Sequence, residues 1–265
     1  MKLSLIITTY NWPEALLLVL ESIKRQTIVP FEVIIADDGS TNETRNLINN
    51  FNQKSNFNIV HSWHEDLGFR AAKARNKAIS KATGDYIILI DGDSILHTNF
   101  LKDHIFHSEP GYFIQGSRVL MTSGETQKVL QNKKIYFSFF SSKFKNKKNA
   151  IYSRFLSKIF LRKENHLRGI RSCNLAFYKQ DCININGFNN NFEGWGREDS
   201  EFIVRLINSG INRKNIRFNA IQFHLWHNEN PRKNLELNDA ILQETISKSI
   251  KWCEDGINSI KTNES

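Results

Sequence analysis

Two carboxylates separated by one glycine, Asp91-Gly92-Asp93, are the first residues in this chain whose type and spacing suggest chemistry. They follow residues 86–90, an apolar run typical of a buried strand. Hard divalent cations prefer oxygen ligands and bind readily where carboxylates and substrate phosphates meet. This DxD pattern therefore favours a site for Mn²⁺ or Mg²⁺ with a diphosphate, built by Asp91 and Asp93. Acidic turns that bind nothing share the pattern, so the pair needs support from other residues.

A second unusual segment is Gly194-Trp195-Gly196-Arg197-Glu198-Asp199. Its two glycines permit a tight loop that presents the indole face of Trp195, and such faces stack on sugar rings. Glu198 and Asp199 then fall in the first turn of a helix expected over residues 196–209, where a carboxylate can accept a proton from a hydroxyl group. The simpler alternatives are helix capping by the two acids and core packing of the tryptophan.

Two histidines, His224 and His227, follow a strand expected over residues 216–223. Without Cys or Glu partners nearby they are weak support for a zinc site. A histidine that completes a site opened by Asp91 and Asp93 is more plausible, because imidazole suits Mn²⁺ better than Mg²⁺. One of the two can face a metal while the other packs.

The elements that must position these residues alternate between strand and helix. Strands are expected over residues 3–9, 31–36, 57–62 and 86–90, and helices from residue 13 and over residues 41–51 and 70–82. Helix-length connections predict an α/β fold with a mainly parallel central sheet flanked by helices. Polar residues at the carboxyl ends of such strands share one rim, where ligands bind. Further along, residues 171–178 are expected to return to the sheet, and residues 235–260 to form a C-terminal helical extension.

Two residues expected at this rim, Asp38 and Arg70, could bind a ligand or could have a purely structural role. Asp38 lies in an Asp-Asp-Gly-Ser turn that could simply end a strand, although a carboxylate there could also accept hydrogen bonds from a base or a ribose. Arg70 lies near a helix N-terminus, where its charge opposes the helix dipole, so an anionic partner is favoured. A solvated surface would also accommodate Arg70.

Composition limits the class of protein. The 265 residues, 40% of them hydrophobic, are enough to bury a substantial core. Three cysteines without a CxxC pair give no disulfide framework or thiolate zinc site, which fits a reducing cytoplasm. No apolar stretch approaches the roughly 20 residues of a membrane span, and the N-terminus is interpreted as a first strand rather than a signal peptide.

The net charge of +9 is concentrated in one segment. Residues 128–171 hold 13 of the 36 Lys and Arg residues but a single acid, Glu164, and aromatic residues are interleaved with the cations. Such a composition suits anionic lipid headgroups, an anionic acceptor or nucleic acid. A solvated insertion has the same composition, so both interpretations stand at this point.

Other classes of protein fit less well. A dinucleotide-binding oxidoreductase lacks its GxGxxG after any early strand. An aspartyl-phosphate phosphohydrolase needs its nucleophile after the first strand, where this chain has Thr8-Thr9-Tyr10-Asn11. A nucleic-acid-binding module would show strong, salt-dependent binding through the basic segment.

Taken together, these residues resemble family 2 glycosyltransferases of the GT-A fold, with a C-terminal portion similar to the galactosyltransferase and polypeptide GalNAc-transferase types. The matching segments, in the family's order, are residues 6–11, 36–41, 72–76, 89–93, 194–199 and 224–227. They span residues 3 to about 230 and leave residues 128–168 and the C-terminal helix outside the resemblance.

The resemblance implies a role for each matching residue. The nucleotide, most often a uridine diphosphate, would lie against Thr8, Tyr10, Asn11, Asp38, Arg70, Asn76 and Asp91. The metal would be bound by Asp93 with Asp91 and His227, the latter preferred over His224. Asp199 would be the catalytic base beside Glu198, and the sugar and acceptor side would comprise Trp195, Gly194, Arg197 and His224. Inversion at the anomeric carbon is implied, although the GWGxED segment is shared with retaining relatives.

The resemblance also implies an organisation and partners. A GT-A domain would span residues 1–232, with a nucleotide-binding half (1–125), a basic aromatic insertion (126–170) and an acceptor half (171–232), followed by a helical tail (233–265). Such an enzyme would transfer a hexose or N-acetylhexosamine from a UDP-sugar to a glycan or glycolipid of a bacterial surface polysaccharide or lipopolysaccharide. We expect a cytoplasmic protein, with no nucleic acid partner and with a peripheral contact to the membrane through residues 128–171. The alternative is a catalytically silent scaffold that binds nucleic acid or anionic lipid.

Overall fold

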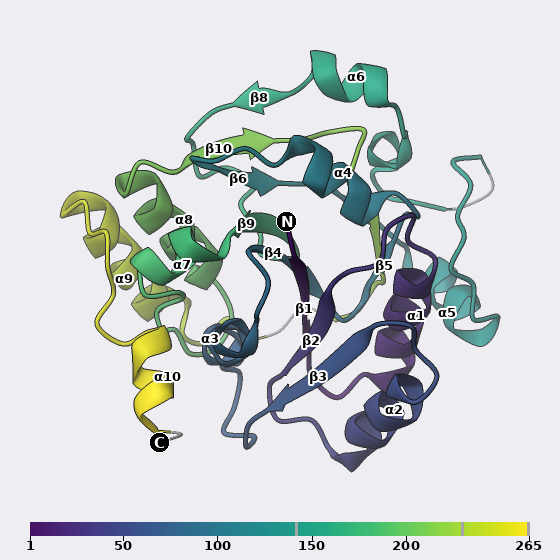
Figure 1. The fold of residues 1–265 in the computed structure, drawn as a ribbon, viewed down its shortest axis with the longest axis horizontal. Helices are drawn as coiled ribbons and strands as arrows, with labels where there is room; N and C mark the ends of the chain where they lie inside the picture. The colour runs from purple at the N-terminus through teal and green to yellow at the C-terminus, as the bar shows by residue number, and fades with distance from the viewer. Residues whose placement is uncertain (141–142, 229–230, 264–265) are drawn as a thin grey trace.

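The structure, a computed structural model, describes residues 1–140, 143–228 and 231–263. Its large sheet contains β1 (Leu3–Thr9), β2 (Glu32–Asp37), β3 (Asn58–Trp63), β4 (Tyr86–Asp91), β6 (Tyr112–Gln115), β8 (Arg162–Lys163), β9 (Asn174–Tyr178) and β10 (Asn212–Asn215). The strand order is β3-β2-β1-β4-β9-β6-β10-β8 (Figure 1). Only β9 and β8 oppose the direction of the other six strands, so the expected mostly parallel sheet is confirmed.

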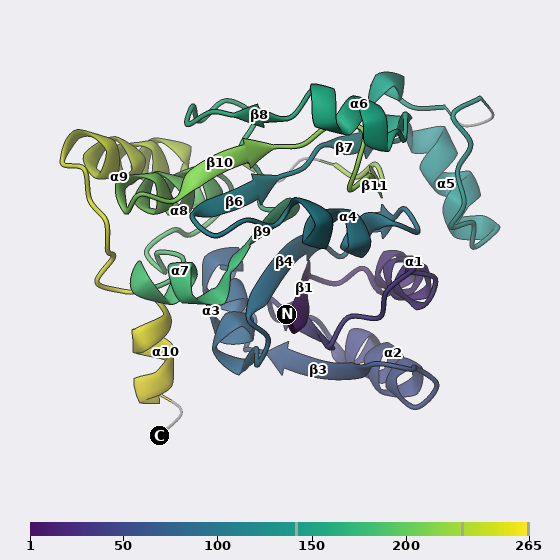
Figure 2. The same cartoon turned by 45° about the horizontal axis from the view of Figure 1, so that its top comes forward.

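Helices cover both faces of this sheet (Figures 1 and 2). They are α1 (Pro13–Lys24), α2 (Asn42–Asn52), α3 (Ala71–Lys81), α4 (Phe100–His107), α5 (Ser123–Gln131), α6 (Arg154–Ile159), α7 (Lys179–Asn184), α8 (Glu198–Asn208), α9 (Leu235–Ser247) and α10 (Ile257–Asn263), with a 3₁₀ turn η1 (Lys147–Ala150). Because side chains alternate along a strand, Leu5 and Ile7 of β1 join a core with α1, α2 and α4. Ile6 joins the opposite core with α3, α7, α8 and α10. The strands are therefore buried on both sides.

A second, smaller sheet has the order β5-β11-β7 and is formed by β5 (Ser94–Leu96), β7 (Arg118–Leu120) and β11 (Gln222–His224). The antiparallel register pairs His224 with Ser94, which brings the histidine segment beside the DxD segment. The continuous strand expected over residues 216–223 is wrong: Phe218 and Ala220 have φ angles of 64° and 46°, so the chain bends before β11.

The C-terminal segment also differs from the expectation of one helix over residues 235–260. Ser249 has a φ angle of 49°, and the chain forms two helices, α9 and α10. Helix α9 packs on α8, whereas α10 packs on α3. Within the described ranges, no helix is both long and apolar enough to cross a membrane.

Candidate active site

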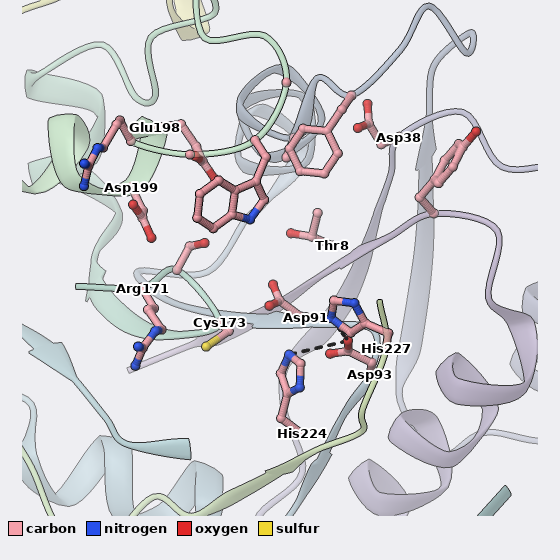
Figure 3. Close-up of a pocket in the computed structure, with 18 of the residues that line it drawn as sticks. Thr8, Asp38, Asp91, Asp93, Arg171, Cys173, Glu198, Asp199, His224 and His227 are labelled. Carbon is pink, nitrogen blue, oxygen red and sulfur yellow. Dashed lines mark ion pairs between the residues drawn. The ribbon is translucent and has the colours of Figure 1, made fainter. Parts of the chain in front are cut away.

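A single large cavity, of about 1660 Å³, opens at the carboxyl ends of β1, β2 and β4 (Figure 3). Its wall is completed by the DxD segment, the loop before β9, the Gly-Trp-Gly loop before α8 and the histidines after β11. Parallel strands bring these distant segments to one rim, as expected for an α/β sheet. The cavity therefore gathers nearly all the residues that the sequence singled out.

One end of the cavity is lined by Thr8, Tyr10, Asn11 and Asp38. Asn11 has a φ angle of 44°, and its side-chain oxygen accepts a hydrogen bond from the backbone N–H of Thr41 at 2.9 Å. Asp38 is buried, with its Oδ1 2.6 Å from His64 Nε2 and its Oδ2 accepting the backbone N–H of Arg70 at 2.8 Å. These contacts hold the backbone and the carboxylate in fixed positions while Tyr10 stays half exposed.

Two residues expected beside the nucleotide do not line this cavity. The guanidinium of Arg70 donates to the backbone oxygen of Glu65 instead of reaching into the cavity. Asn76 is fully buried: its side chain accepts the backbone N–H of Phe188 at 2.8 Å and donates to Asn190 at 2.8 Å. Asn76 thus connects α3 to the segment before the Gly-Trp-Gly loop. The nucleotide site proposed below includes neither Arg70 nor Asn76.

Asp93, His224 and His227 form a cluster whose potential ligand atoms all lie within 4.8 Å of one another. Asp93 Oδ2 is 3.5 Å from His224 Nε2 and 3.3 Å from His227 Nε2, and these two ion-pair contacts join the three residues (Figure 3). His227 Nδ1 lies 2.6 Å from the backbone oxygen of Asn228 and, since a carbonyl only accepts, donates to it, so Nε2, which faces Asp93, is the nitrogen available to a metal.

This donor set fits a divalent metal. One carboxylate and two imidazoles suit Mn²⁺ better than Mg²⁺, which prefers oxygen ligands. The residues of this cluster differ from the expected metal ligands in two respects. His224, expected on the sugar side, belongs to the cluster. Asp91, expected as a ligand, lies next to the cluster but is not one of its three residues. The register of β11 on β5 explains the first difference, because it carries His224 to the strand position opposite Ser94.

Asp91 lies at the end of β4, in the wall of the cavity. Burial raises the pKa of its carboxyl group, and Asp93 raises it further, while Arg75 acts in the opposite direction. Gly92 lets the two carboxylates approach β1, since a Cβ atom at that position would lie 2.9 Å from the side-chain oxygen of Thr9. The same Cβ would lie 3.1 Å from the backbone oxygen of Thr8, so the close packing of this turn on β1 favours glycine between the two acids.

Arg75, which sequence reasoning left out of the site, connects its two halves. Its side chain is buried, with NH1 3.1 Å from Glu198 Oε1 and Nε 3.3 Å from Thr8 Oγ1. Arg75 lies within the Ala72–Asn76 segment on which the family resemblance rests. The sequence does not reveal that its side chain points from α3 into the cavity. The contact fixes the start of α8 against the end of β1.

The Gly-Trp-Gly loop shapes the opposite end of the cavity through left-handed backbone angles that its glycines adopt readily. Gly194, Gly196 and Arg197 have φ angles of 73°, 106° and 77°. Trp195 is 37% exposed, and the guanidinium of Arg232 lies 4.7 Å from the centre of its ring, so the indole is not buried in the core. The left-handed Arg197 is held by an ion pair with Asp239 of α9.

The C-terminal helix α9 supports this loop from outside. Asn238 donates to the backbone oxygens of Glu193 at 3.1 Å and Gly196 at 3.0 Å, and Asn234 donates to Glu193 at 3.2 Å. The tail is therefore part of the structure that positions the site, although it lies outside the motifs.

Asp199 lies in the first turn of α8 and faces the cavity (Figure 3). Burial, followed by the neighbouring charge of Glu198, raises the pKa of its carboxyl group to about 7. Arg75 and the backbone N–H of Ser200, 2.7 Å from Asp199 Oδ1, act in the opposite direction. A carboxylate with a pKa near neutral pH is well suited to accept a proton from a substrate hydroxyl group.

Comparison with known proteins agrees with this geometry. Residues 4–181 match glycosyl transferase family 2, and residues 153–228 match the family described as the N-terminal domain of galactosyltransferase. Since the first match covers more than half of the sequence, the chain belongs to glycosyltransferase family 2.

Individual relatives are longer proteins. The chain is 28% identical to a chondroitin synthase of Escherichia coli and 29% identical to a hyaluronan synthase of Pasteurella multocida, over 90% and 88% of its own length. It spans 36% and 25% of those proteins. A crystal structure of residues 1–349 of S. aureus TarS in complex with UDP-GlcNAc aligns with a TM-score of 0.59 and 18% identity, over 86% of this chain and 60% of that one. The fold is thus the GT-A fold.

Proposed function

We propose that this protein transfers a sugar from a UDP-sugar to a hydroxyl group of a glycan or glycolipid acceptor used in a bacterial surface polysaccharide or lipopolysaccharide. The observation that carries the proposal is that one cavity contains both Asp199, with its raised pKa, and the Asp93, His224 and His227 cluster. Its volume of about 1660 Å³ exceeds the roughly 300–1,000 Å³ of a typical small-molecule pocket, so donor and acceptor can be held together. The TarS complex with UDP-GlcNAc supports a UDP-sugar donor.

Donor binding follows from the contents of the nucleotide end. Tyr10 offers an aromatic face to the base, and the carboxylate of Asp38, with Thr8 and Asn11, offers polar atoms to the base and ribose. A bound Mn²⁺ ion would be held by the Asp93 cluster beside Asp91 and would supply positive charge that stabilises the departing diphosphate.

The chemistry of transfer is one displacement. As the acceptor oxygen forms its bond to the anomeric carbon, the proton of the hydroxyl group passes to Asp199. The bond from the anomeric carbon to the phosphate oxygen breaks, and UDP leaves with the electron pair. Attack opposite the leaving group inverts the anomeric configuration. Trp195, with Gly194 and Arg197 beside it, provides the surface on which a sugar ring stacks.

The proposal is tested by UDP release from a panel of UDP-sugars with Mn²⁺ and an extract of bacterial surface glycans. We expect release that depends on both donor and acceptor, and a loss of about 10²–10⁴-fold in Asp199→Asn, the usual range for removal of a general base. Asp181→Asn is the matched control, because burial also raises the pKa of Asp181 but its side chain lies outside the cavity. Equal rates in both variants would contradict the assignment.

For localisation, we propose that helix α6 contacts an anionic membrane surface. Phe155 and Ile159 are 72% and 58% exposed on this short helix, next to the cations Arg154 and Lys158. Exposed apolar side chains beside cations suit an interface of anionic lipid. Co-sedimentation with phosphatidylglycerol vesicles should be lost in the double variant F155S/I159S. It should persist in the control Leu237→Ser, which alters a residue 69% exposed on α9. Equal sedimentation of all three proteins would contradict the proposal.

A further inference from the structure

The side of the cavity beyond Asp199 carries several cations. Arg168 and Arg171 come from the loop before β9, Arg118 from β7 and Lys145 from the segment before η1, and all four line the cavity. Arg171 lies near Asp199 and Cys173, on the side away from Asp38 (Figure 3). Arg171 therefore lies beside the carboxylate proposed as the base, whereas Arg118 lies close enough to Asp91 to influence its carboxyl group.

Three of these four cations lack a carboxylate partner in the part of the chain that the structure describes. Among the described residues, no carboxylate forms an ion pair with Lys145, Arg168 or Arg171, in contrast to Arg75 and Arg197, which pair with Glu198 and Asp239. Lys145, Arg168 and Arg171 are thus available to pair with an anionic ligand in this cavity.

Arg118 adds an independent observation. Its Nε atom is buried and has no hydrogen-bond partner within the described part of the chain, which is costly for a charged donor. Burial raises the pKa of the Cys173 thiol to about 12, while Arg118 and Arg171 both act to lower it. Arg118 of β7 and Arg171 of the loop before β9 thus belong to the same cavity wall as Cys173.

We propose that the acceptor is anionic and that its carboxylate or phosphodiester group binds Arg168 and Arg171, with Arg118 and Lys145 nearby. Planar guanidinium groups bind such oxyanions through paired hydrogen bonds, which orients the ligand as well as attracting it. A hydroxyl group next to the anion would then face Asp199. The proposal rests on the glycosyltransferase function above and specifies its acceptor class. It also gives a role to part of the basic segment that the family motifs leave out.

The test measures binding of three probes by calorimetry, with and without UDP and Mn²⁺. The probes are an oligosaccharide of alternating glucuronate and N-acetylhexosamine, its carboxyl-reduced neutral counterpart, and a ribitol-phosphate oligomer. We expect at least one charged probe to bind about tenfold or more tightly than the neutral one, as charge-assisted hydrogen bonds imply. Whichever charged probe binds identifies the anion as carboxylate or phosphate. Equal affinity for charged and neutral probes, or no binding of either charged probe, would overturn the proposal.

Two variants make the result specific. The double variant R168Q/R171Q should lose the preference for the charged probe and keep its affinity for UDP. Lys148→Gln, which removes an exposed cation of the same basic segment outside the cavity, should change neither. If R168Q/R171Q instead weakens UDP binding alone, these cations serve the donor and the proposal is wrong. If the wild-type protein binds a charged probe but not UDP, the donor assignment fails while the anion site stands.

Discussion

Glu198 raises the pKa of Asp199, the residue we propose as the base, and this gives a prediction with a definite sign. Asp199 has a pKa of about 7 because it is buried and because Glu198 adds negative charge, while Arg75 opposes both. A general base works only when deprotonated, so kcat/KM of the wild-type protein should fall about tenfold per pH unit below pH 7. The acidic limb of the kcat/KM profile reports the pKa of this group in the free enzyme.

Glu198→Gln should move that limb to lower pH. The substitution removes the second cause of the raised pKa and leaves the buried guanidinium of Arg75, now without its partner 3.1 Å away, to stabilise the Asp199 carboxylate. Neighbouring charges change a carboxyl pKa by about one unit or more, so the limb should shift down by roughly one pH unit. At pH 6 the deprotonated fraction of Asp199 would then rise from about a tenth to about a half.

The assay is kcat/KM for UDP release between pH 5 and 9, with each variant scaled to its own plateau and Asp181→Asn as the control. A titration of the Asp199 carboxyl by ¹³C NMR provides the same pKa directly, even if Glu198→Gln reduces turnover. An acidic limb that stays in place, or that moves to higher pH, would refute the electrostatic reasoning.

Three further predictions concern the framework of the site. Trp195→Ala should raise the acceptor KM about tenfold, as expected for a lost stacking face, with little change in melting temperature because the indole is partly exposed and packs against the guanidinium of Arg232; a large fall in melting temperature would show a core role instead. Arg205→Met should destabilise the fold by about 3–5 kcal/mol in urea unfolding, because it leaves the buried Glu201 carboxylate, 2.7 Å from Arg205 Nε, without its partner; a neutral result would contradict this. Gly92→Ala should weaken Mn²⁺ binding about tenfold, measured by electron paramagnetic resonance, because the added Cβ displaces the DxD turn; unchanged affinity would show that the turn adapts.

The strands and helices of the first half could be predicted from sequence because each has a long, uniform signal. Residues 3–9 are apolar and β-branched and coincide with β1, and Pro13 begins α1 as expected. The short strands β6, β7 and β10, with three or four residues each, have no such signal. Their formation depends on pairing with distant strands, as when β10 pairs with β6 across about 100 residues of chain.

The site was predictable in its residue types but not in all their directions. Asp93, His227, Asp199 and the residues at the end of β1 line one cavity, as the motifs indicated. The role of His224 depends on the β11 register, and the inward direction of Arg75 depends on where Glu198 lies in three dimensions. Asn76 belongs to the same motif as Arg75, but its amide is used to hold the backbone at Phe188. Two adjacent residues of one motif thus have different roles: Arg75 lines the cavity, whereas Asn76 stabilises the fold.

The central claim, that this cavity binds a UDP-sugar with a divalent metal, is tested most directly by calorimetric titration of UDP into the protein with Mn²⁺ or with EDTA. We expect binding that requires Mn²⁺ in the wild-type protein and is lost in Asp93→Asn, which keeps the shape of the side chain but removes its charge from the cluster with His224 and His227. Absence of UDP binding under both conditions, or equal binding by Asp93→Asn, would contradict the account.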